Sequence, residues 1–434
     1  MRWNPVRSST RRLSRKSART GNGAGRKAAK AILPCLKETK SLNPCVYMKN
    51  IVIASDSFKG SLSSAEVASA AEDGIKAVFP DCNVTKICIA DGGEGTTEAL
   101  VKALGGQMTS VQVHDPLMRP IEAAYGITDD ECGEASCGRT AVIEMSAASG
   151  LPLLAPSERN PLKTTTFGTG EMILDACRKG CRRFLLGIGG SATNDAGTGI
   201  LSALGVKFLD KDGNLLQGTG ENLSRIACVD MSGVPAGIFS SEFTVACDVG
   251  NPFCGPDGAA YVFAPQKGAG KEDVGVLDRG LKSFAGITEK FCGRDISTLK
   301  GAGAAGGLGG ALAAYLDARL VPGSEMILEA VGFDGKIAGA DLVITGEGKI
   351  DRQTSMGKVP SAVLRHASAM GIPVIAIAGC IDRDLEGNNG FTAVFPVSPG
   401  NIPAEEAMQP AVAAANVRRT VSQIMNVIKM SENE

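Results

Sequence analysis

Acidic side chains follow four separate apolar runs of the sequence, at Asp56, Asp91, Glu347 and Asp382. Glycines or lysines stand close to each of them, and Lys59 follows the first acid by three positions. Carboxylates in such positions can ligate Mg²⁺ or accept a proton from a hydroxyl group, and a lysine can neutralise a phosphate or a carboxylate. The pattern therefore predicts a site for an anionic substrate together with a cation.

The elements around these acids indicate how they could meet. Apolar strands alternate with amphipathic helices, which predicts an α/β fold with a parallel sheet and helices on both of its faces. Adjacent strands lie ~4.8 Å apart, and ligands of such sheets bind outside the carboxyl ends of the strands. We therefore expect the four acids at one rim. The predicted strands span residues 51–54, 84–90, 342–345 and 374–378, and the predicted helices span residues 64–78, 96–104, 359–370 and 407–429.

The segment at residues 90–95 combines Asp91 and Glu94 with two glycines, Gly92 and Gly93. Glycines at a helix start leave its first N–H groups open to an anion, and the two carboxylates suit Mg²⁺, which prefers oxygen ligands. Helix capping by the acids is the alternative interpretation. Phosphate and metal binding is favoured because the segment has more glycines than a cap requires.

A second glycine-rich segment, residues 184–210, has several interpretations. A strand, a glycine turn, a helix and a strand that ends at Asp210 outline a nicotinamide-binding unit. However, Asp195 would repel a pyrophosphate, and the backbone N–H groups of the turn could cradle a terminal phosphate instead. The third interpretation is a capped helix whose polar side chains have no role in ligand binding. The candidate phosphate-binding residues are Gly189, Gly190, Ser191 and Asn194.

Three downstream segments add weaker signals. Residues 301–307 (GAGAAGG) have the glycine spacing of a dinucleotide fingerprint, but no predicted strand precedes them, so close helix packing is favoured. Lys349 is a candidate phosphate ligand and Asp351 a candidate metal ligand, whereas Lys358 is expected to be solvated. Asp248 precedes a Pro- and Gly-rich turn that is either a binding loop or only a turn.

The 434-residue chain is long enough for two domains. Residues 113–325 contain patterns typical of antiparallel strands and a hairpin signal at Asp212 and Gly213. We expect them to form a second α/β domain, inserted into a first domain of residues 48–112 and 326–434. No apolar run reaches the ~18 residues that span a bilayer, so we expect a soluble protein without a membrane partner.

The first 47 residues contain twelve Lys or Arg and one acid, Glu38, which leaves 33 bases and 45 acids in the rest of the chain. A nucleic-acid partner is therefore not expected. The basic extension is predicted to be either disordered or a transit-like segment. Thirteen cysteines without a C-x-x-C pair, and only two histidines, argue against a zinc site and favour a reducing, cytoplasmic location. Organelle import is the alternative if the extension is a genuine transit segment.

Eight motifs occur in the order expected of the bacterial glycerate kinase family, which the chain resembles from residue 48 to about residue 429. The sequence departs from the family pattern at Ser55, Gly250 and Lys349, where Pro, Asp and Arg are usual, and the change at Gly250 argues against an acidic role there. The motifs are DSFKGSL, DGGEGT, NPL-TTTFGTGE, GIGGSATNDAG, ACDV-NP-CGP-GA, PQKGA, GAGAAGGLG and TGEGKID-QT--GK, with dashes at positions outside the motif.

The resemblance implies a flavodoxin-like, doubly wound domain with the second α/β domain inserted into it. It also implies an enzyme that phosphorylates D-glycerate with ATP, with Mg²⁺ as cofactor and 2-phosphoglycerate as the favoured product. Phosphoryl transfer needs alignment, charge neutralisation and a base near the acceptor hydroxyl. We therefore expect Asp56 or Asp195 as the base, and Lys59, Lys349 and Ser57 as ligands of substrate or phosphate. The candidate Mg²⁺ ligands are Asp91, Glu94, Glu347, Asp351 and Asp195.

Two alternatives stay open at the level of the sequence. One is a nicotinamide-dependent dehydrogenase of a small hydroxy acid, built on residues 184–210, and the other is a catalytically silent sugar-acid sensor. Phosphorylation at the 3-hydroxyl is also compatible with the motifs, and so is a homodimer.

Overall fold

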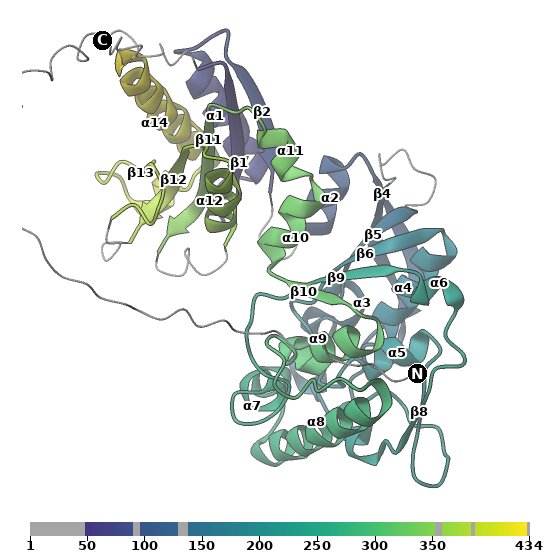
Figure 1. Ribbon diagram of the computed structural model, residues 1–434. Coiled ribbons are helices and arrows are strands. Elements are labelled where there is room, and N and C mark those ends of the chain that lie inside the picture. The colour runs from purple at the N-terminus through teal and green to yellow at the C-terminus, as the bar shows by residue number, and fades with distance from the viewer. Residues whose placement is uncertain (1–47, 90–95, 129–137, 352–357, 383–386, 432–434) are drawn as a thin grey trace, which may run out of the picture. The chain divides into compact units, whose positions relative to one another are not determined.

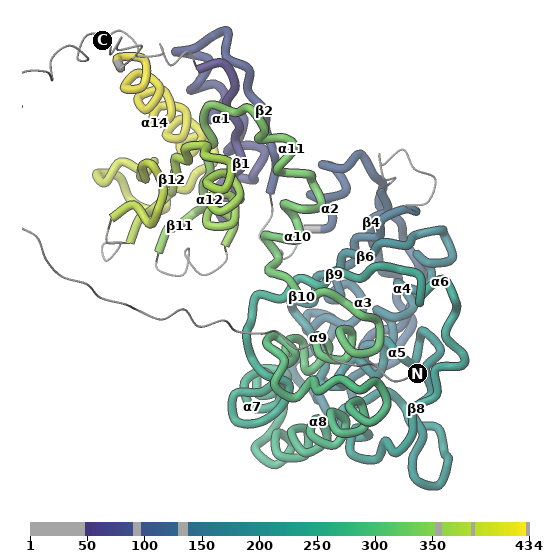
Figure 2. Tube along the Cα trace, in the orientation of Figure 1, coloured from purple at the N-terminus to yellow at the C-terminus, as the bar shows by residue number. Residues whose placement is uncertain are grey.

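The computed structural model describes residues 48–89, 96–128, 138–351, 358–382 and 387–431. Among these residues, five strands form a parallel sheet in the spatial order β13-β12-β11-β1-β2. Numbered along the chain the order reads 2-1-3-4-5, and it reverses between β1 and β11. Figure 2 shows that the purple start and the yellow-green end of the described chain build this sheet together. Its strands are β1 (Asn50–Ser55), β2 (Asn83–Cys88), β11 (Leu342–Ile350), β12 (Val374–Ile381) and β13 (Ala393–Pro396).

Helices cover both faces of this sheet, which is why its central strands are apolar throughout. Ile51 and Ile53 pack in one cluster with α1 (Ser64–Lys76) and α14 (Pro410–Ser431), and these two helices lie side by side in Figure 1. Val52 and Ala54 point to the opposite face, as alternation along a strand requires, and pack with α12 (Val359–Ala369). The shorter helices of this part are α11 (Phe333–Ile337) and α13 (Ala404–Ala407), whereas α2 (Thr96–Ala103) and α10 (Gly323–Ala330) also contact strands of a second sheet.

A six-stranded mixed sheet, again counted over the described residues, lies between β2 and β11 in the chain and has the order β10-β9-β6-β5-β4-β3. The pairs β3–β4 and β4–β5 are antiparallel, as predicted, whereas β5, β6, β9 and β10 run parallel. Its strands are β3 (Gln107–His114), β4 (Pro120–Thr128), β5 (Arg139–Glu144), β6 (Cys181–Gly187), β9 (Glu242–Ala246) and β10 (Arg319–Val321).

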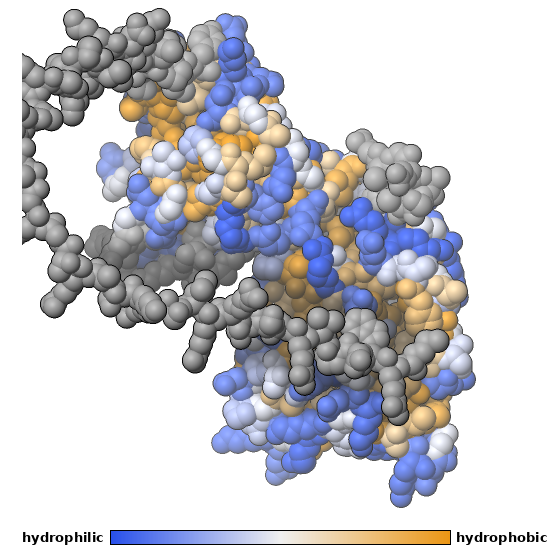
Figure 3. All heavy atoms as spheres, in the orientation of Figure 1, coloured by the Kyte–Doolittle hydropathy of each residue, from blue (hydrophilic) through white to orange (hydrophobic). Residues whose placement is uncertain are grey.

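Seven α-helices and a two-stranded ribbon accompany the mixed sheet in the described chain. Its longest helix is the amphipathic α8, which ends at Gly293 in the left-handed conformation that glycine adopts readily at this position. Figure 3 shows hydrophilic residues over α8 on the face that it draws. The helices are α3 (Ser146–Ser149), α4 (Phe167–Arg178), α5 (Thr198–Ala203), α6 (Ala236–Phe239), α7 (Ala259–Phe263), α8 (Lys271–Cys292) and α9 (Ala304–Tyr315), and the ribbon pairs β7 (Lys207–Leu209) with β8 (Cys228–Asp230).

The predicted α/β architecture with a parallel sheet is confirmed, but two of its strands, β11 and β12, extend at least three residues beyond their predicted ends. Strand β11 continues past residue 345 because Gly346, Glu347 and Lys349 keep pairing with β12. Strand β12 likewise continues past residue 378. Acids and glycines that looked like a loop in the sequence therefore extend the sheet toward its ligand-binding edge. No helix within the described ranges is both long enough and apolar enough to cross a membrane.

Candidate active site

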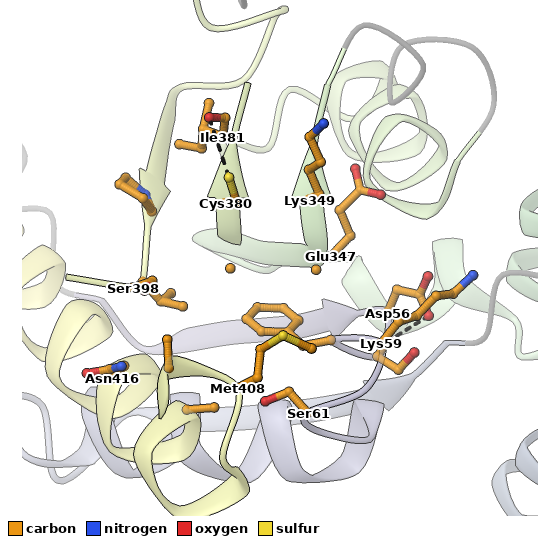
Figure 4. A pocket seen from close by; sticks show the side chains of 18 of the residues that line it. Asp56, Lys59, Ser61, Glu347, Lys349, Cys380, Ile381, Ser398, Met408 and Asn416 are labelled. Atoms are coloured by element: carbon orange, nitrogen blue, oxygen red, sulfur yellow. Dashed lines mark hydrogen bonds between the residues drawn. The ribbon is translucent and has the colours of Figure 1, made fainter. Parts of the chain in front are cut away.

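A cleft of about 1220 Å³ opens outside the carboxyl ends of the parallel strands. It includes the meeting point of β1 and β11, where the strand order reverses and where doubly wound sheets bind their ligands. Figure 4 shows Asp56 and Lys59, which follow β1, and Glu347 of β11 in this cleft. The charged residues in its wall are Asp56, Lys59, Asp248, Glu347, Lys349 and Lys358.

The segment DSFKGSL after β1 forms a tight turn that presents polar side chains to the cleft. Phe58 and Leu62 are buried, and the Phe58 N–H group donates to the Leu62 carbonyl oxygen over 2.8 Å. Between them Gly60 has a φ of 76°, a left-handed conformation that costs glycine little. Ser63 and Glu66 then start α1 with a reciprocal capping box. The turn residues in the cleft wall are Asp56, Ser57, Lys59 and Ser61.

Glu347 lies on β11 between two glycines, Gly346 and Gly348. A Cβ atom on Gly346 would lie 2.6 Å from the carbonyl oxygen of Ile377, and one on Gly348 would lie 3.4 Å from the backbone nitrogen of Lys59. Gly346 therefore lets β12 approach β11 closely, and at Gly348 the turn after β1 lies at van der Waals distance. Glu347 is 6% exposed and lines the cleft beside that turn.

Lys358 lies close to two carboxylates at this edge of the sheet. Its Nζ atom is 3.5 Å from Oε2 of Glu347 and 3.8 Å from Oδ1 of Asp351. Its side chain is partly exposed, as expected, but it also lines the cleft. The Nζ atom of Lys349 lies 3.4 Å from Oδ2 of Asp382. Alternating positive and negative groups of this kind can receive phosphate groups and a cation together.

Asp248, which follows β9 of the mixed sheet, adds a third carboxylate to the cleft wall. Its Oδ1 atom accepts a hydrogen bond of 2.9 Å from the N–H group of Gly323, at the start of α10. Ser324 lines the same cleft. The position of Asp248 in the cleft favours a binding loop over a plain turn for this segment.

Asp195 lies in a different environment, fully buried between β6 and α5. Its carboxylate accepts hydrogen bonds from the N–H and hydroxyl groups of Thr166, both at 2.8 Å, and from the N–H groups of Gly197 and Gly199. Burial raises the pKa of Asp195, and these hydrogen bonds oppose the rise. Four donors on one buried carboxylate favour the capping interpretation of this segment over a general base.

Lys267, the lysine of the motif PQKGA, is a buried residue whose role could not be predicted from its local sequence. Its Nζ atom donates to Oγ of Ser191 over 2.7 Å and to the carbonyl oxygen of Thr193 over 2.6 Å. Burial lowers the pKa of Lys267 to about 7, although the charge of Asp195 acts in the opposite direction. The lysine thus fixes the turn between β6 and α5 from inside the protein.

The predicted phosphate-binding residues of that turn differ in their accessibility. Gly189 and Gly190 are exposed, whereas Ser191 is 9% exposed and Asn194 is fully buried. Within the described residues, both amide atoms of Asn194 lack a hydrogen-bond partner. The structure thus leaves only the two glycines of this group openly accessible. The predicted residues Asp91, Gly92, Gly93 and Glu94 lie outside the described residues.

The nicotinamide-binding interpretation of residues 184–210 is wrong. Such a unit needs its second strand in the same parallel sheet as the first, but β7 pairs antiparallel with β8 in a separate ribbon. The close-packing interpretation of residues 301–307 agrees with the structure, since a Cβ atom on Gly306 would lie 2.3 Å from the carbonyl oxygen of Thr193.

Each of the two histidines contacts carboxylate side chains of neighbouring elements. Nδ1 of His114 lies 3.0 Å from both carboxylate oxygens of Glu171, and His366 contacts Glu325 and Asp334. In the part of the chain that the structure describes, no three His, Cys, Asp or Glu side chains converge as a metal centre.

The fold and the cleft define an α/β enzyme with a charged ligand site at the switch point of a parallel sheet. A model of the glycerate kinase family matches residues 51–429. Glycerate kinase of Bacillus subtilis (strain 168) is 47% identical over 384 residues, which are 88% of this chain and 98% of that protein. Glycerate 2-kinase of Escherichia coli (strain K12) is 44% identical over 349 residues, 80% of this chain and 90% of that protein.

A crystal structure from Salmonella typhimurium LT2, assigned to glycerate kinase 2, has a TM-score of 0.78 and 42% sequence identity. The matched region covers 89% of this chain and 100% of the Salmonella chain. The chain belongs to the glycerate kinase family, a family of phosphotransferases, so the family predicted from the eight motifs is confirmed.

Proposed function

We propose that the protein transfers the γ-phosphoryl group of ATP to the 2-hydroxyl group of D-glycerate. Family membership supports the reaction, and the name of the E. coli relative supports the 2-position. The observation that carries the proposal is the cleft at the β1–β11 switch point, because three carboxylates and three lysines line it. Phosphoryl transfer needs this combination, since the phosphates and the glycerate carboxylate are anions and the attacking hydroxyl must lose a proton.

Asp56 is the proposed base. It is 7% exposed, it lies in the cleft wall, and its Oδ1 atom accepts the N–H group of Ser57 over 2.6 Å, which orients the carboxylate. The glycerate oxygen bonds to the γ-phosphorus, its proton passes to Asp56, and the bond to the ADP oxygen breaks. Lys59 and Lys349 are the proposed ligands of the glycerate carboxylate and of the transferred phosphoryl group.

Mg²⁺ fits the carboxylates at the edge of β11. Glu347 and Asp351 both approach the ammonium group of Lys358, so their oxygens already converge on a positive charge. Mg²⁺ commonly binds one or two carboxylates and completes its shell with phosphate oxygens and waters, so these two residues would hold it. When bound, the ion would neutralise charge on the ATP phosphates.

We further infer a flavodoxin-like domain with an inserted domain. The strand order 2-1-3-4-5 is that of flavodoxin-like sheets, and the strands of the mixed sheet lie between residues 107 and 321. This range supports an insertion near the predicted residues 113–325, within a domain of residues 48–112 and 326–434. The homodimer and the cytoplasmic location stay predictions.

The experiment that tests the function is an ADP-release assay with D-glycerate and ATP, in Mg²⁺ and then in EDTA. We expect turnover that depends on Mg²⁺, and NMR of the product should show phosphate on the 2-oxygen. No turnover in Mg²⁺ would refute the proposal. Asp56→Asn should lower kcat by about 10²- to 10⁴-fold, whereas Asp81→Asn, which changes an exposed carboxylate in the turn before β2, should not.

A further inference from the structure

The cleft has an apolar end in addition to its charged end. The apolar residues come from the segment after β13 and from α13 and α14, and side chains of the turn after β1 complete the wall. Figure 4 shows Ser398 and Asn416 on one side of the cleft, and Asp56 and Lys59 on the other. The apolar lining residues include Phe58, Val397, Ile402, Ala407, Met408 and Ala413.

Two polar groups in this wall are buried and have no hydrogen-bond partner among the described residues: Nδ2 of Asn416 and Oγ of Ser61. Asn416 is 6% exposed and lies within α14, where asparagine is a poor helix former. A buried amide donor without a partner destabilises a fold. The unpaired amide donor of Asn416 lies in the wall of a cleft, so a bound ligand that supplies an acceptor would explain why it has no partner in the protein.

We propose that this apolar end binds the purine base of the nucleotide, with Nδ2 of Asn416 donating to a ring nitrogen. The inference rests on the proposed kinase function. A purine ring is flat and apolar on its faces, and its unprotonated ring nitrogens can only accept hydrogen bonds, so an apolar wall with one unpaired donor matches it. With the base there, the phosphates extend toward Lys349 and Lys358 at the charged end. The cleft, at about 1220 Å³, has room for the whole nucleotide.

The test compares Asn416→Leu with Asn426→Leu, which changes an exposed asparagine of the same helix. Asn416→Leu should raise KM for ATP about tenfold, the effect of one lost buried hydrogen bond, with kcat and KM for glycerate within about twofold. Inhibition by inorganic tripolyphosphate should not change, because that probe has phosphates but no base. An unchanged KM for ATP, or an equal loss of tripolyphosphate binding, would overturn the proposal. Asn426→Leu should match the wild type in all of these.

The acceptor on the base can be identified with 1-deaza-, 3-deaza- and 7-deaza-ATP, each of which lacks one ring nitrogen. One of them should bind the wild type about tenfold more weakly than ATP, and Asn416→Leu should abolish this difference. If all three discriminate equally in the variant and the wild type, Asn416 does not contact the base.

A measurement on the wild-type protein keeps the proposal testable even if the variants fold poorly. Photolabelling with 2-azido-ATP should modify the tryptic peptide that follows Arg383 and ends at Arg418, which contains Val397, Met408 and Asn416. Turnover with a label confined to other peptides would overturn the base site and leave the kinase function standing. Absence of turnover with glycerate would refute the function, and the base site with it.

Discussion

Lys267 should make the stability of the protein rise with pH, whereas an ion-paired lysine, whose pKa is raised, makes the stability fall as pH rises. The side chain is 1% exposed, and burial lowers its pKa from 10.5 to about 7. Between these two values the unfolded chain binds more protons at this position than the folded chain, so the free energy of unfolding rises with pH. Below about pH 7 both states are protonated, and the slope disappears.

The size of the effect follows from the two pKa values. Integrated from pH 7 to pH 9, the difference in proton binding amounts to about 2 kcal/mol of added stability. The lysine can release its proton without losing its contacts, because a neutral amine still donates to Oγ of Ser191 and to the carbonyl oxygen of Thr193. The geometry that holds the turn is therefore compatible with the uncharged form.

Lys267→Met removes the titrating group and keeps a side chain of similar length. The substitution destabilises the protein because it leaves two buried oxygens without their donor, and this loss does not depend on pH. The free energy of unfolding of the wild type minus that of the variant should therefore change with pH only through the titration of Lys267. Urea unfolding at pH 7 and pH 9, followed by tyrosine fluorescence, should show that difference change by about 2 kcal/mol. The signal reports this part of the chain because three of the four tyrosines are Tyr125, Tyr261 and Tyr315.

Lys282→Met is the matched control. Lys282 has an exposed side chain, and its hydrogen bond to Asp278 raises its pKa, so it stays protonated in both states from pH 7 to pH 9. Its removal should give the same stability difference at both pH values. If the Lys267→Met difference is equally flat, the lysine is charged in the folded protein, and the reasoning from burial is refuted.

Two further predictions concern the first sheet and its helices. In thermal unfolding, Gly346→Ala should destabilise the protein by about 1–3 kcal/mol, since its Cβ atom would lie 2.6 Å from a carbonyl oxygen of β12. As a control, Gly335→Ala should be neutral or stabilising, because a Cβ atom at this position of α11 meets open space. Burial alone would lower the pKa of His366, but its contacts with Glu325 and Asp334 raise the pKa by more than burial lowers it, so the net shift is upward. The stability that His366 contributes is complete below its unfolded pKa near 6.5 and is lost as pH rises through the folded value, so His366→Gln should flatten the decline of urea stability above pH 6.5.

The parallel sheet could be predicted from sequence because its environment is uniform. Residues 51–54 and 374–378 are buried on both faces, so apolar runs mark them without ambiguity. The ends of the strands were harder, because Gly346, Glu347 and Lys349 have the composition of a loop. Their pairing with β12 depends on residues about 30 positions away and overrides the local preference.

The polar groups buried by tertiary contacts could not be predicted in the same way. Lys267 is an ordinary lysine in its local sequence, and its burial comes from contacts with a turn more than 70 residues earlier in the chain. Asn416 stands in an alanine-rich helix, and only the arrangement of that helix along the cleft gives its amide group a place in the wall. Motif order identifies the family, but it does not state which polar atoms are left without a partner.

The two acids considered for the base illustrate the same limit. Asp56 and Asp195 both follow an apolar strand, and both stand near glycines and hydroxyl groups in the sequence. A general base must reach the hydroxyl proton of the substrate, and the wall of an open cleft allows this for Asp56. Asp195 is sealed, because α9 begins against its turn and the N–H group of Ala196 donates to the carbonyl oxygen of Gly306. Packing between segments a hundred residues apart therefore separates two carboxylates that the sequence alone left equivalent.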